Sequence, residues 1–420
     1  MFSVISFGGL PAQTLSKAEK KIVDNIDATM PQTMQLLKDA VNINSGTFNI
    51  AGVKQTGALF ARELEALGFT VSWITMPDSL KRAGHLVAQR KGKKGKRVLL
   101  VGHLDTVFEP DMPANPFSMV NDTTATGQGV VDMKGGDVMI IAALKALHQQ
   151  NLLDNTTITV YFTGDEENAG SPFTVSRGDF IQKSKEHDVA LAFESAMSMD
   201  TVTIARRGAS EWKLEVEAKQ AHSSGIFRTG YGSIYEAARI INSFRERLST
   251  QPYLTFNPAL IIGGSDVQYD SIAQRGAVSS KTNIISPKTV VIGDLRFLTE
   301  EQKERARDTM RMIVNEHLPG TNARISFEDG IPSMPPTAGN DSVRQLVNVV
   351  SIALGYGEVK AGDPGKRGAG DISYIAKYIN CLDGLGSSGN GSHAPGETIN
   401  LSEYPKLIRR TALTIYRLTR

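Results

Sequence analysis

The stretch at residues 157–170, TITVYFTGDEENAG, joins an apolar and β-branched run to three consecutive acids. Residue types of this kind favour strands, so residues 157–164 are predicted to form a buried strand that leads into Asp165, Glu166 and Glu167. Adjacent carboxylates repel one another most strongly where water is excluded. The placement therefore indicates that positive charge meets these acids at the end of the strand.

Strands and helices alternate on both sides of this stretch. The further strand patterns cover residues 70–76, 85–91, 97–105 and 189–195. The helical patterns run from Lys17, with an interruption at Pro31, and then over residues 53–67, 136–150 and 178–187. Alternation of this size predicts an α/β layered domain with a mostly parallel central sheet.

The pattern changes after Met199. Residues 201–220 read as paired antiparallel strands, and they are followed by a helix at 232–248, strands at 254–264 and 289–298, a helix at 299–318 and a strand at 323–329. Two helices among four strands predict a small α+β domain of ferredoxin type.

The first kind of pattern returns near Gly330, with helices at 341–354, near 371–377 and from about 402. The smaller domain is therefore predicted to be inserted into the larger one. The expected division is 1–206 for the first part of the larger domain, 207–329 for the inserted domain and 330–420 for the second part.

Composition and charge limit the classes of partner. The chain has 420 residues, 40% of them hydrophobic, and a net charge of +2, which predicts no strong attraction to nucleic acid or to an acidic membrane. A short basic run at 90–97, RKGKKGKR, is interpreted as a solvated hairpin turn. Cys381 is the single cysteine, so an intrachain disulfide and a cysteine metal cluster are excluded, and a metal site must use histidines and carboxylates.

The amino-terminal segment, residues 1–21, is apolar, then small, then polar, like the tail of an export signal. It lacks the basic start of such signals, and its apolar part is short. We expect a periplasmic or secreted protein, with a cytoplasmic one as the alternative. No stretch of the sequence approaches the roughly 20 apolar residues of a membrane-spanning helix.

Metal-binding residue types follow the expected strands. Ligands bind at the carboxyl ends of the strands in sheets of this kind. The candidates at or near such ends are His103, Asp105, Asp132, Glu166, Glu167, Glu194 and His393. Taken singly, each has an ordinary structural interpretation as a core histidine, a solvated loop acid or a helix cap. Together they favour two divalent cations about 3.5–4 Å apart, which would balance the negative charge.

The motifs GHLDTV, GQGVVDMKGG, GDEENAGS, FES and GSHAPGETI resemble, in this order, the signatures of the M20 metallopeptidases. The resemblance covers the chain from about the first helix to its end. It is nearest to the glutamate carboxypeptidase (carboxypeptidase G2-like) branch, and acetylornithine deacetylases, succinyl-diaminopimelate desuccinylases and peptidase T share the pattern. It implies a zinc-exopeptidase-like catalytic domain with an inserted lid or dimerisation domain, and a homodimer.

The resemblance also implies roles for individual residues. His103 and Glu194 would bind one Zn²⁺ ion, Glu167 and His393 the second, and Asp132 would bridge the two, with Co²⁺ as a substitute metal. Each subunit would therefore hold two ions.

Three further residues near these ligands acquire roles in the same way. Asp105 would hydrogen-bond the His103 ring and orient it. Glu166 would be the general base that takes a proton from water and later passes it to the leaving nitrogen. The peptide bond before Met133 is expected to be cis.

The inserted domain supplies candidates for substrate binding. His222 matches a histidine that reaches across a dimer interface to stabilise an oxyanion, and Asn283 and Arg296 match residues that hold the substrate's carboxylate. Arg296 could instead pair with Asp294 as an ordinary surface residue. Arg367 lies where the chain departs from the family pattern, and it is either an extra carboxylate anchor or a loop residue.

Three functions remain open on this basis. The first is a di-zinc hydrolase that releases a C-terminal amino acid from an N-acyl or peptidyl substrate, with glutamate as the candidate, although Ile331 stands where glutamate-releasing members place a basic residue. The second is a deacylase, desuccinylase or dipeptidase of the same chemistry. The third is a catalytically inactive binding protein on the same fold, against which the complete ligand set and Glu166 argue.

Overall fold

The computed structural model describes residues 14–271 and 273–420, which form two compact units. Of the described residues, the first unit comprises 14–204, Pro336–Asp363 and Ile375–Arg420. The second comprises Ala205–Pro335 and Pro364–Tyr374. Most of the apolar part of the expected export leader falls on residues 1–13 and so lies outside the described residues. Within the described part of the chain, no helix is both long and apolar enough to cross a bilayer.

A six-stranded sheet lies at the centre of the first unit, in the order β1-β2-β6-β3-β7-β16. Its strands are β1 (Thr70–Ile74), β2 (His85–Arg90), β3 (Lys94–His103), β6 (Thr156–Thr163), β7 (Val189–Ala192) and β16 (Asn380–Leu382). β6, β3, β7 and β16 run parallel, whereas β2 is antiparallel to β6 and β1 to β2. The expected mostly parallel sheet is confirmed.

The basic run at 90–97 is not a hairpin turn. Strand β6 lies between β2 and β3 and pairs with both, so the two strands on either side of the run are not neighbours. β3 already begins at Lys94, inside the run. The prediction was wrong because sequence adjacency alone does not reveal a third strand that inserts between two others.

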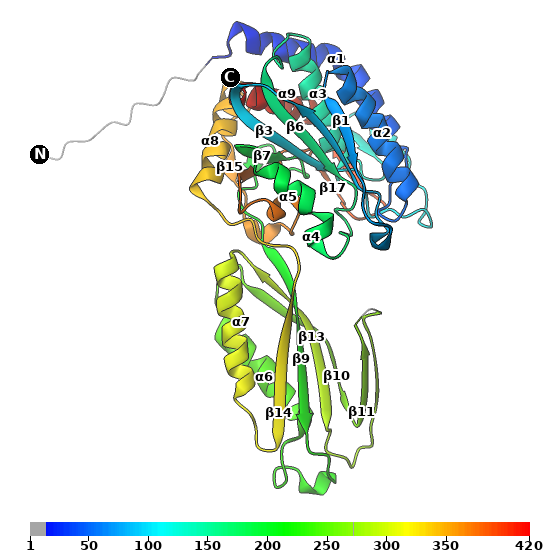
Figure 1. Ribbon diagram of the computed structural model, residues 1–420, viewed down its shortest axis with the longest axis vertical. Helices are drawn as coiled ribbons and strands as arrows, with labels where there is room; N and C mark the ends of the chain where they lie inside the picture. The colour runs from blue at the N-terminus through cyan, green and yellow to red at the C-terminus, as the bar shows by residue number, and fades with distance from the viewer. Residues whose placement is uncertain (1–13, 272) are drawn as a thin grey trace, which may run out of the picture. The chain divides into compact units, whose positions relative to one another are not determined.

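Helices cover this sheet, as Figure 1 shows. They are α1 (Lys17–Val41), α2 (Ile50–Ala66), α3 (Lys134–His148), α4 (Phe173–Ser176), α5 (Gly178–Ser184), α8 (Ala338–Ala353) and α9 (Tyr404–Leu418). α1, α3 and α9 contact one another, α3 and α9 both contact β3, and α2 lies on β1 and β2. Their apolar faces form one continuous core with the sheet.

Pro31 does not interrupt the first helix, contrary to the sequence-based expectation. α1 is a single helix with Pro31 inside it. Proline removes one backbone hydrogen bond, to the carbonyl four residues earlier, here Asp27. Both Pro31 and Asp27 are exposed, so water can satisfy that carbonyl.

A second, small sheet has the order β17-β18-β5-β4 and was not anticipated. It consists of β4 (Ser118–Asn121), β5 (Thr124–Thr126), β17 (Gly389–Asn390) and β18 (Thr398–Asn400). β18 pairs with β5, which brings the loop after β5 beside the loop before β18. The first of these loops contains the Asp132–Met133 peptide bond, which is cis as expected.

The second unit is a four-stranded antiparallel sheet in the order β10-β13-β9-β14. Its elements are β9 (Gly208–Ala218), α6 (Gly232–Leu248), β10 (Thr255–Gly264), β11 (Asp266–Asp270), β12 (Arg275–Ser279), β13 (Lys288–Phe297), α7 (Glu300–Asn315) and β14 (Thr321–Asp329). Side chains of α6 and α7 share one apolar core with the sheet, around Trp212 and Phe244. The β-α-β-β-α-β order agrees with the expected α+β domain, to which the β11–β12 hairpin is an addition.

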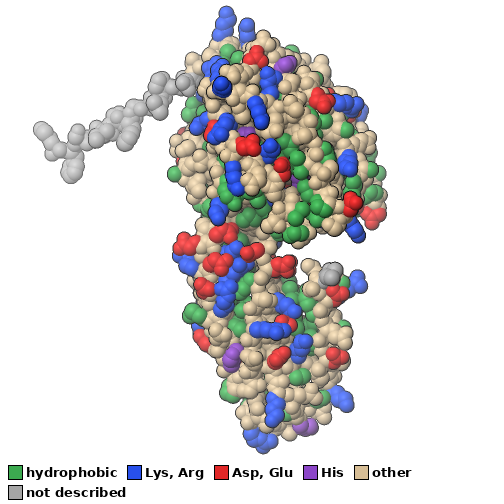
Figure 2. Space-filling view, in the orientation of Figure 1, with side chains coloured by type: hydrophobic (Ala, Val, Ile, Leu, Met, Phe, Trp, Pro, Cys, Tyr) green, Lys and Arg blue, Asp and Glu red, His purple; other side chains and the backbone are tan. Residues whose placement is uncertain are grey.

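Acidic and basic side chains are interspersed over α7, as Figure 2 shows. Lys303 and Arg307 both pair with Asp329, and Arg311 pairs with Asp308. The basic side chains of this helix are therefore ion-paired, and those of Lys303 and Arg307 are only 10% and 6% exposed.

Two further expectations need correction. Residues 201–220 are not a strand pair, because β8 (Thr201–Val202) pairs with β15 (Lys360–Ala361) in the first unit, while β9 belongs to the second unit. The helix expected near 371–377 is a single 3₁₀ turn at Asp371–Tyr374. Asp371–Tyr374 groups with the second unit, although sequence analysis assigned it to the catalytic domain.

Candidate metal centre

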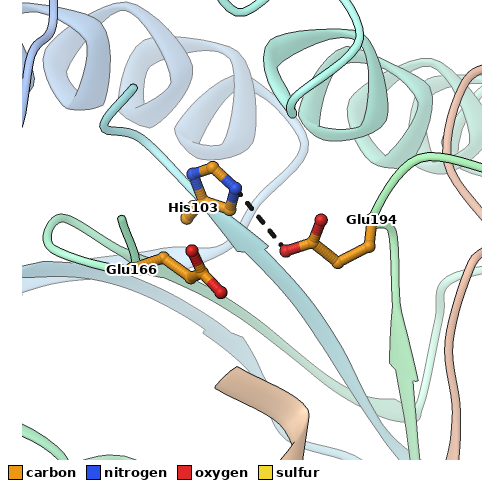
Figure 3. A group of neighbouring side chains, drawn as sticks. All are labelled: His103, Glu166 and Glu194. Carbon is orange, nitrogen blue, oxygen red and sulfur yellow. Dashed lines mark ion pairs between the residues drawn. The ribbon is translucent and has the colours of Figure 1, made fainter. Parts of the chain in front are cut away.

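Three neighbouring parallel strands deliver side chains to one edge of the sheet. His103 is the last residue of β3, Glu166 and Glu167 follow β6, and Glu194 follows β7. β6 and β7 flank β3, so their carboxyl ends lie side by side. Figure 3 shows the carboxylates of Glu166 and Glu194 turned toward the His103 ring. The distance from His103 Nε2 to Glu194 Oε1 is 3.5 Å.

Asp132 lies between two histidines. Its Oδ1 is 3.3 Å from His103 Nε2, and its Oδ2 is 3.2 Å from His393 Nε2. His393 Nε2 is also 3.1 Å from Glu167 Oε2. The residues thus form two groups of one histidine and one glutamate each, and they share the carboxylate of Asp132.

These donors fit divalent cations. One ligand atom from each of His103, Asp132 and Glu167 lies within 4.8 Å of the others. The side chains of His103 and Glu167 are 1% and 6% exposed, and Glu167 Oε1 is a buried oxygen without a hydrogen-bond partner among the described residues. An unsatisfied buried oxygen is costly. Imidazole nitrogens and carboxylate oxygens are ligands that zinc accepts.

The electrostatics of the centre favour positive charge. Hydrogen bonds to Asp132 and Glu167 raise the pKa of His393 to about 11. Burial by itself would lower the pKa of His103, but its interactions with the carboxylates of Asp105 and Asp132 outweigh burial and hold that pKa well above the usual value. Burial by itself would raise the pKa of Asp132. Its hydrogen bonds to His103 and His393 outweigh burial and lower that pKa. The carboxylates therefore create a field that stabilises cations at both histidines.

Comparison with known proteins shows the family of this chain. Residues 99–417 match the model of peptidase family M20/M25/M40. The chain belongs to this family. It is therefore a hydrolase of the M20 metallopeptidases, as its motif order suggested.

Individual relatives and one solved structure support the assignment. The chain is 26% identical to carboxypeptidase G2 of Pseudomonas sp. (strain RS-16) over 390 residues, which cover 92% of this chain and 89% of the relative. It is 23% identical to succinyl-diaminopimelate desuccinylase of Magnetococcus marinus over 362 residues, 82% of this chain and 88% of the relative. The crystal structure of aminopeptidase PepT from Bacillus cereus shares the fold, with a TM-score of 0.73 and 17% identity over 96% of this chain and 99% of that one.

Asp105 contacts the His103 ring through its backbone rather than through its carboxylate. His103 Nδ1 lies 3.0 Å from the carbonyl oxygen of Asp105 and 3.6 Å from its Oδ1, and only the first distance is that of a hydrogen bond. The Nδ1–H group therefore donates to the carbonyl, which leaves Nε2 as the ligand atom. The contribution of the Asp105 carboxylate to the His103 pKa is accordingly that of a nearby charge.

The carboxylate of Asp105 holds the acidic loop instead. Its Oδ1 accepts the backbone N–H of Glu166 at 2.9 Å, and its Oδ2 accepts that of Glu167 at 3.1 Å. The hydroxyl of Thr47 donates to Oδ2 at 2.6 Å. A single buried carboxylate thus orients the backbone of both glutamates, a role that sequence analysis did not anticipate.

Glu397 is a second residue that sequence analysis missed. It is fully buried, and its carboxylate accepts the backbone N–H groups of Val131 at 2.7 Å, Asp132 at 2.9 Å and Gly129 at 3.1 Å. Burial raises its pKa to about 7, against the effect of these bonds. Glu397 ties the loop of Asp132 to the loop of His393, and its place in the motif GSHAPGETI was the available signal.

The remaining predicted residues belong to the second unit. His222 is exposed, and its Nδ1 accepts the backbone N–H of Ser224 at 3.2 Å, so in the neutral ring the proton is on Nε2. Asn283 lies next to the residue that follows His222, because the backbone carbonyl of Asn283 accepts the N–H of Ser223. The Nε group of Arg296 donates to Asp294 at 2.8 Å.

Arg367 lies in the segment Pro364–Tyr374, which also groups with the second unit. Its backbone N–H donates to the carbonyl of Pro364 at 3.2 Å. The metal centre itself is built from the first unit alone, so the substrate-binding roles of His222, Asn283, Arg296 and Arg367 stay predictions.

Proposed function

We propose that this M20 hydrolase binds two Zn²⁺ ions and cleaves an amide bond, releasing a C-terminal amino acid from an N-acyl or peptidyl substrate. One observation carries the proposal: the two oxygens of Asp132 face one histidine each, and each histidine has its own glutamate. That arrangement supports two cation positions with a shared carboxylate. The similarity to a carboxypeptidase over 92% of the chain supports the direction of cleavage.

The chemistry assigns separate tasks to the side chains. A pair of cations held by His103, Glu194, Asp132, Glu167 and His393 would lower the pKa of bound water to about 7 and would polarise the amide carbonyl. Glu166 accepts the proton of that water and then donates it to the leaving nitrogen. A Ser or Cys nucleophile is not required.

Glu166 needs to be distinguished from a ligand. Its carboxylate is close enough to His103 and Glu194 to share a cation with them, since one ligand atom of each lies within 4.8 Å of the others. Each cation position already has three donors without it, namely a histidine, a glutamate and one oxygen of Asp132. We therefore assign Glu166 to the water and the leaving group.

Residues of the second unit would recognise the substrate. The Nε2–H group of His222 is a donor that suits a developing oxyanion. Arg296 contacts Asp294 through Nε, so its two terminal nitrogens can bind a substrate carboxylate in parallel. These assignments favour substrates with a free carboxylate.

We propose in addition that the second unit mediates a homodimer. Large apolar side chains are exposed on α6 and the edge strand β10, among them Ile234, Tyr235 and Ile261. The ring of the exposed Phe227 lies against that of Tyr235 in a tilted arrangement, with centroids 5.6 Å apart. Exposed apolar patches are typical of interfaces. Light scattering after gel filtration should give the mass of two subunits, and a monomer at all concentrations would contradict the dimer.

A substrate panel with controlled metal content tests the function. The purified enzyme, treated with a chelator, should lose activity and regain it with Zn²⁺ or Co²⁺. At fixed metal, folate-like glutamate amides, N-acetyl and N-succinyl amino acids and dipeptides are compared side by side. Preference for succinylated substrates would favour the desuccinylase alternative. The similarity to a succinyl-diaminopimelate desuccinylase extends over 82% of this chain. Activity that survives thorough metal removal would contradict the proposal.

A further inference from the structure

Asp165, the first of the three consecutive acids, has no task in the proposed chemistry, yet it is completely buried. Arg177, which follows α4, is also 0% exposed and pairs with it. Nη1 of Arg177 donates to Asp165 Oδ1 at 2.6 Å, and Nη2 donates to the backbone carbonyl of the same residue at 3.1 Å. A single guanidinium therefore holds both the side chain and the main chain of Asp165.

The other oxygen of Asp165 closes the loop that carries the glutamates. Asp165 Oδ2 accepts the backbone N–H of Gly170 at 2.8 Å. Glu166 and Glu167 lie between these two residues. Asp165 thus joins the two ends of the loop through its bond with Gly170, and it also bonds Arg177.

His85 provides a second attachment at this position. The N–H of Gly164 donates to His85 Nδ1 at 3.2 Å, so that nitrogen carries no proton. The proton is on Nε2, which donates to the carbonyl of Ser176 at 2.8 Å. The residue before Asp165 is therefore linked to the residue before Arg177, and His85 is fully buried as well.

A contribution to stability alone does not explain the buried ion pair of Asp165 and Arg177 well. Removing two charges from water is costly, and apolar residues of similar size often stabilise a core equally well. The pair does fix the orientation of Asp165, because a planar guanidinium binds two acceptors of one residue at once. On its other side the same loop is held by the Asp105 carboxylate, through the N–H groups of Glu166 and Glu167.

We propose that Asp165 and Arg177 are positioning residues that set the direction of Glu166 toward the reacting water and of Glu167 toward its cation. The inference rests on the proposed function for the role of Glu166. It goes beyond that function because it assigns a task to a buried ion pair outside the ligand set.

Arg177→Lys and Asp165→Asn test the inference, with Arg417→Lys as the matched control. Arg417 forms a comparable, mostly buried pair with Glu19 between α1 and α9 in the same unit. Lysine keeps the charge but cannot hold two acceptors in one plane. We expect both test variants to lose about 10–100-fold in kcat and in calorimetric zinc affinity, with KM and far-UV circular dichroism unchanged. The control should lose stability only.

The outcomes separate this inference from the proposed function. Zinc titration needs no substrate, so weaker zinc binding in Arg177→Lys supports the inference even if no amide of the panel is hydrolysed. Folded variants with wild-type kcat and zinc affinity would overturn the inference and leave the proposed function intact. If neither variant folds, the pair is a stabilising element only, and the inference is overturned.

Discussion

Glu166 and Glu167 are adjacent in the chain, but their surroundings differ. Glu167 Oε2 lies 3.1 Å from His393 Nε2, whereas the carboxylate of Glu166 is turned toward His103 and Glu194. We expect Glu166→Gln to keep both metals and to lose about 10²–10⁴-fold in kcat, the usual effect of removing a general base. Kinetics and metal analysis of the same preparation measure the two effects separately.

The control at the residue scale is Glu186→Gln. Glu186 lies just before β7 begins and is therefore at the opposite end of the sheet from the metal centre. It should behave as wild type in both measurements. Wild-type turnover in Glu166→Gln would mean that another group is the base.

At the scale of elements, the small sheet β17-β18-β5-β4 and the buried Glu397 hold two distant loops together. Glutamine at position 397 would keep one acceptor but would present an NH₂ group to backbone N–H donors. We expect Glu397→Gln to weaken zinc binding by about 10–100-fold, as loss of a partner behind the ligands commonly does. Titration calorimetry measures this, with the exposed Glu358→Gln as the control. Unchanged zinc affinity would show that the pairing of β5 with β18 is sufficient.

Elements with strong periodicity were predictable from the sequence. Helix α6 has the expected bounds, β6 and β13 are each shifted by one residue toward the N-terminus, and β10 begins one residue later than expected. The two-residue β17 and the three-residue β5 were not predictable, because strands so short carry no pattern of their own and form only through distant partners. The position of β6 between β2 and β3 was missed for a different reason, because the order of strands in a sheet does not follow from their order in the sequence.

At the scale of the whole molecule, the metal centre belongs to the first unit alone. Ligands that bind only the folded state stabilise it, by about 2.7 kcal/mol at a concentration 100 times the Kd. We expect removal of metal to lower the unfolding temperature of the first unit and to leave the second unit unaffected. Hydrogen exchange followed by mass spectrometry resolves the two units. If metal removal reduced the protection from hydrogen exchange equally in the β10-β13-β9-β14 sheet and in β3, this expectation would be contradicted.

The sequence by itself determined the fold class, the family and the list of candidate ligands, because local periodicity and the order of short motifs are properties of the chain alone. The tertiary structure decided that Asp132 lies between two histidines, that the carboxylate of Asp105 holds the acidic loop, and that Asp165 is paired with Arg177. Such contacts join segments up to 261 residues apart along the chain, from Asp132 to His393. Strand order and burial set these distances, and neither can be read from spacing in the sequence.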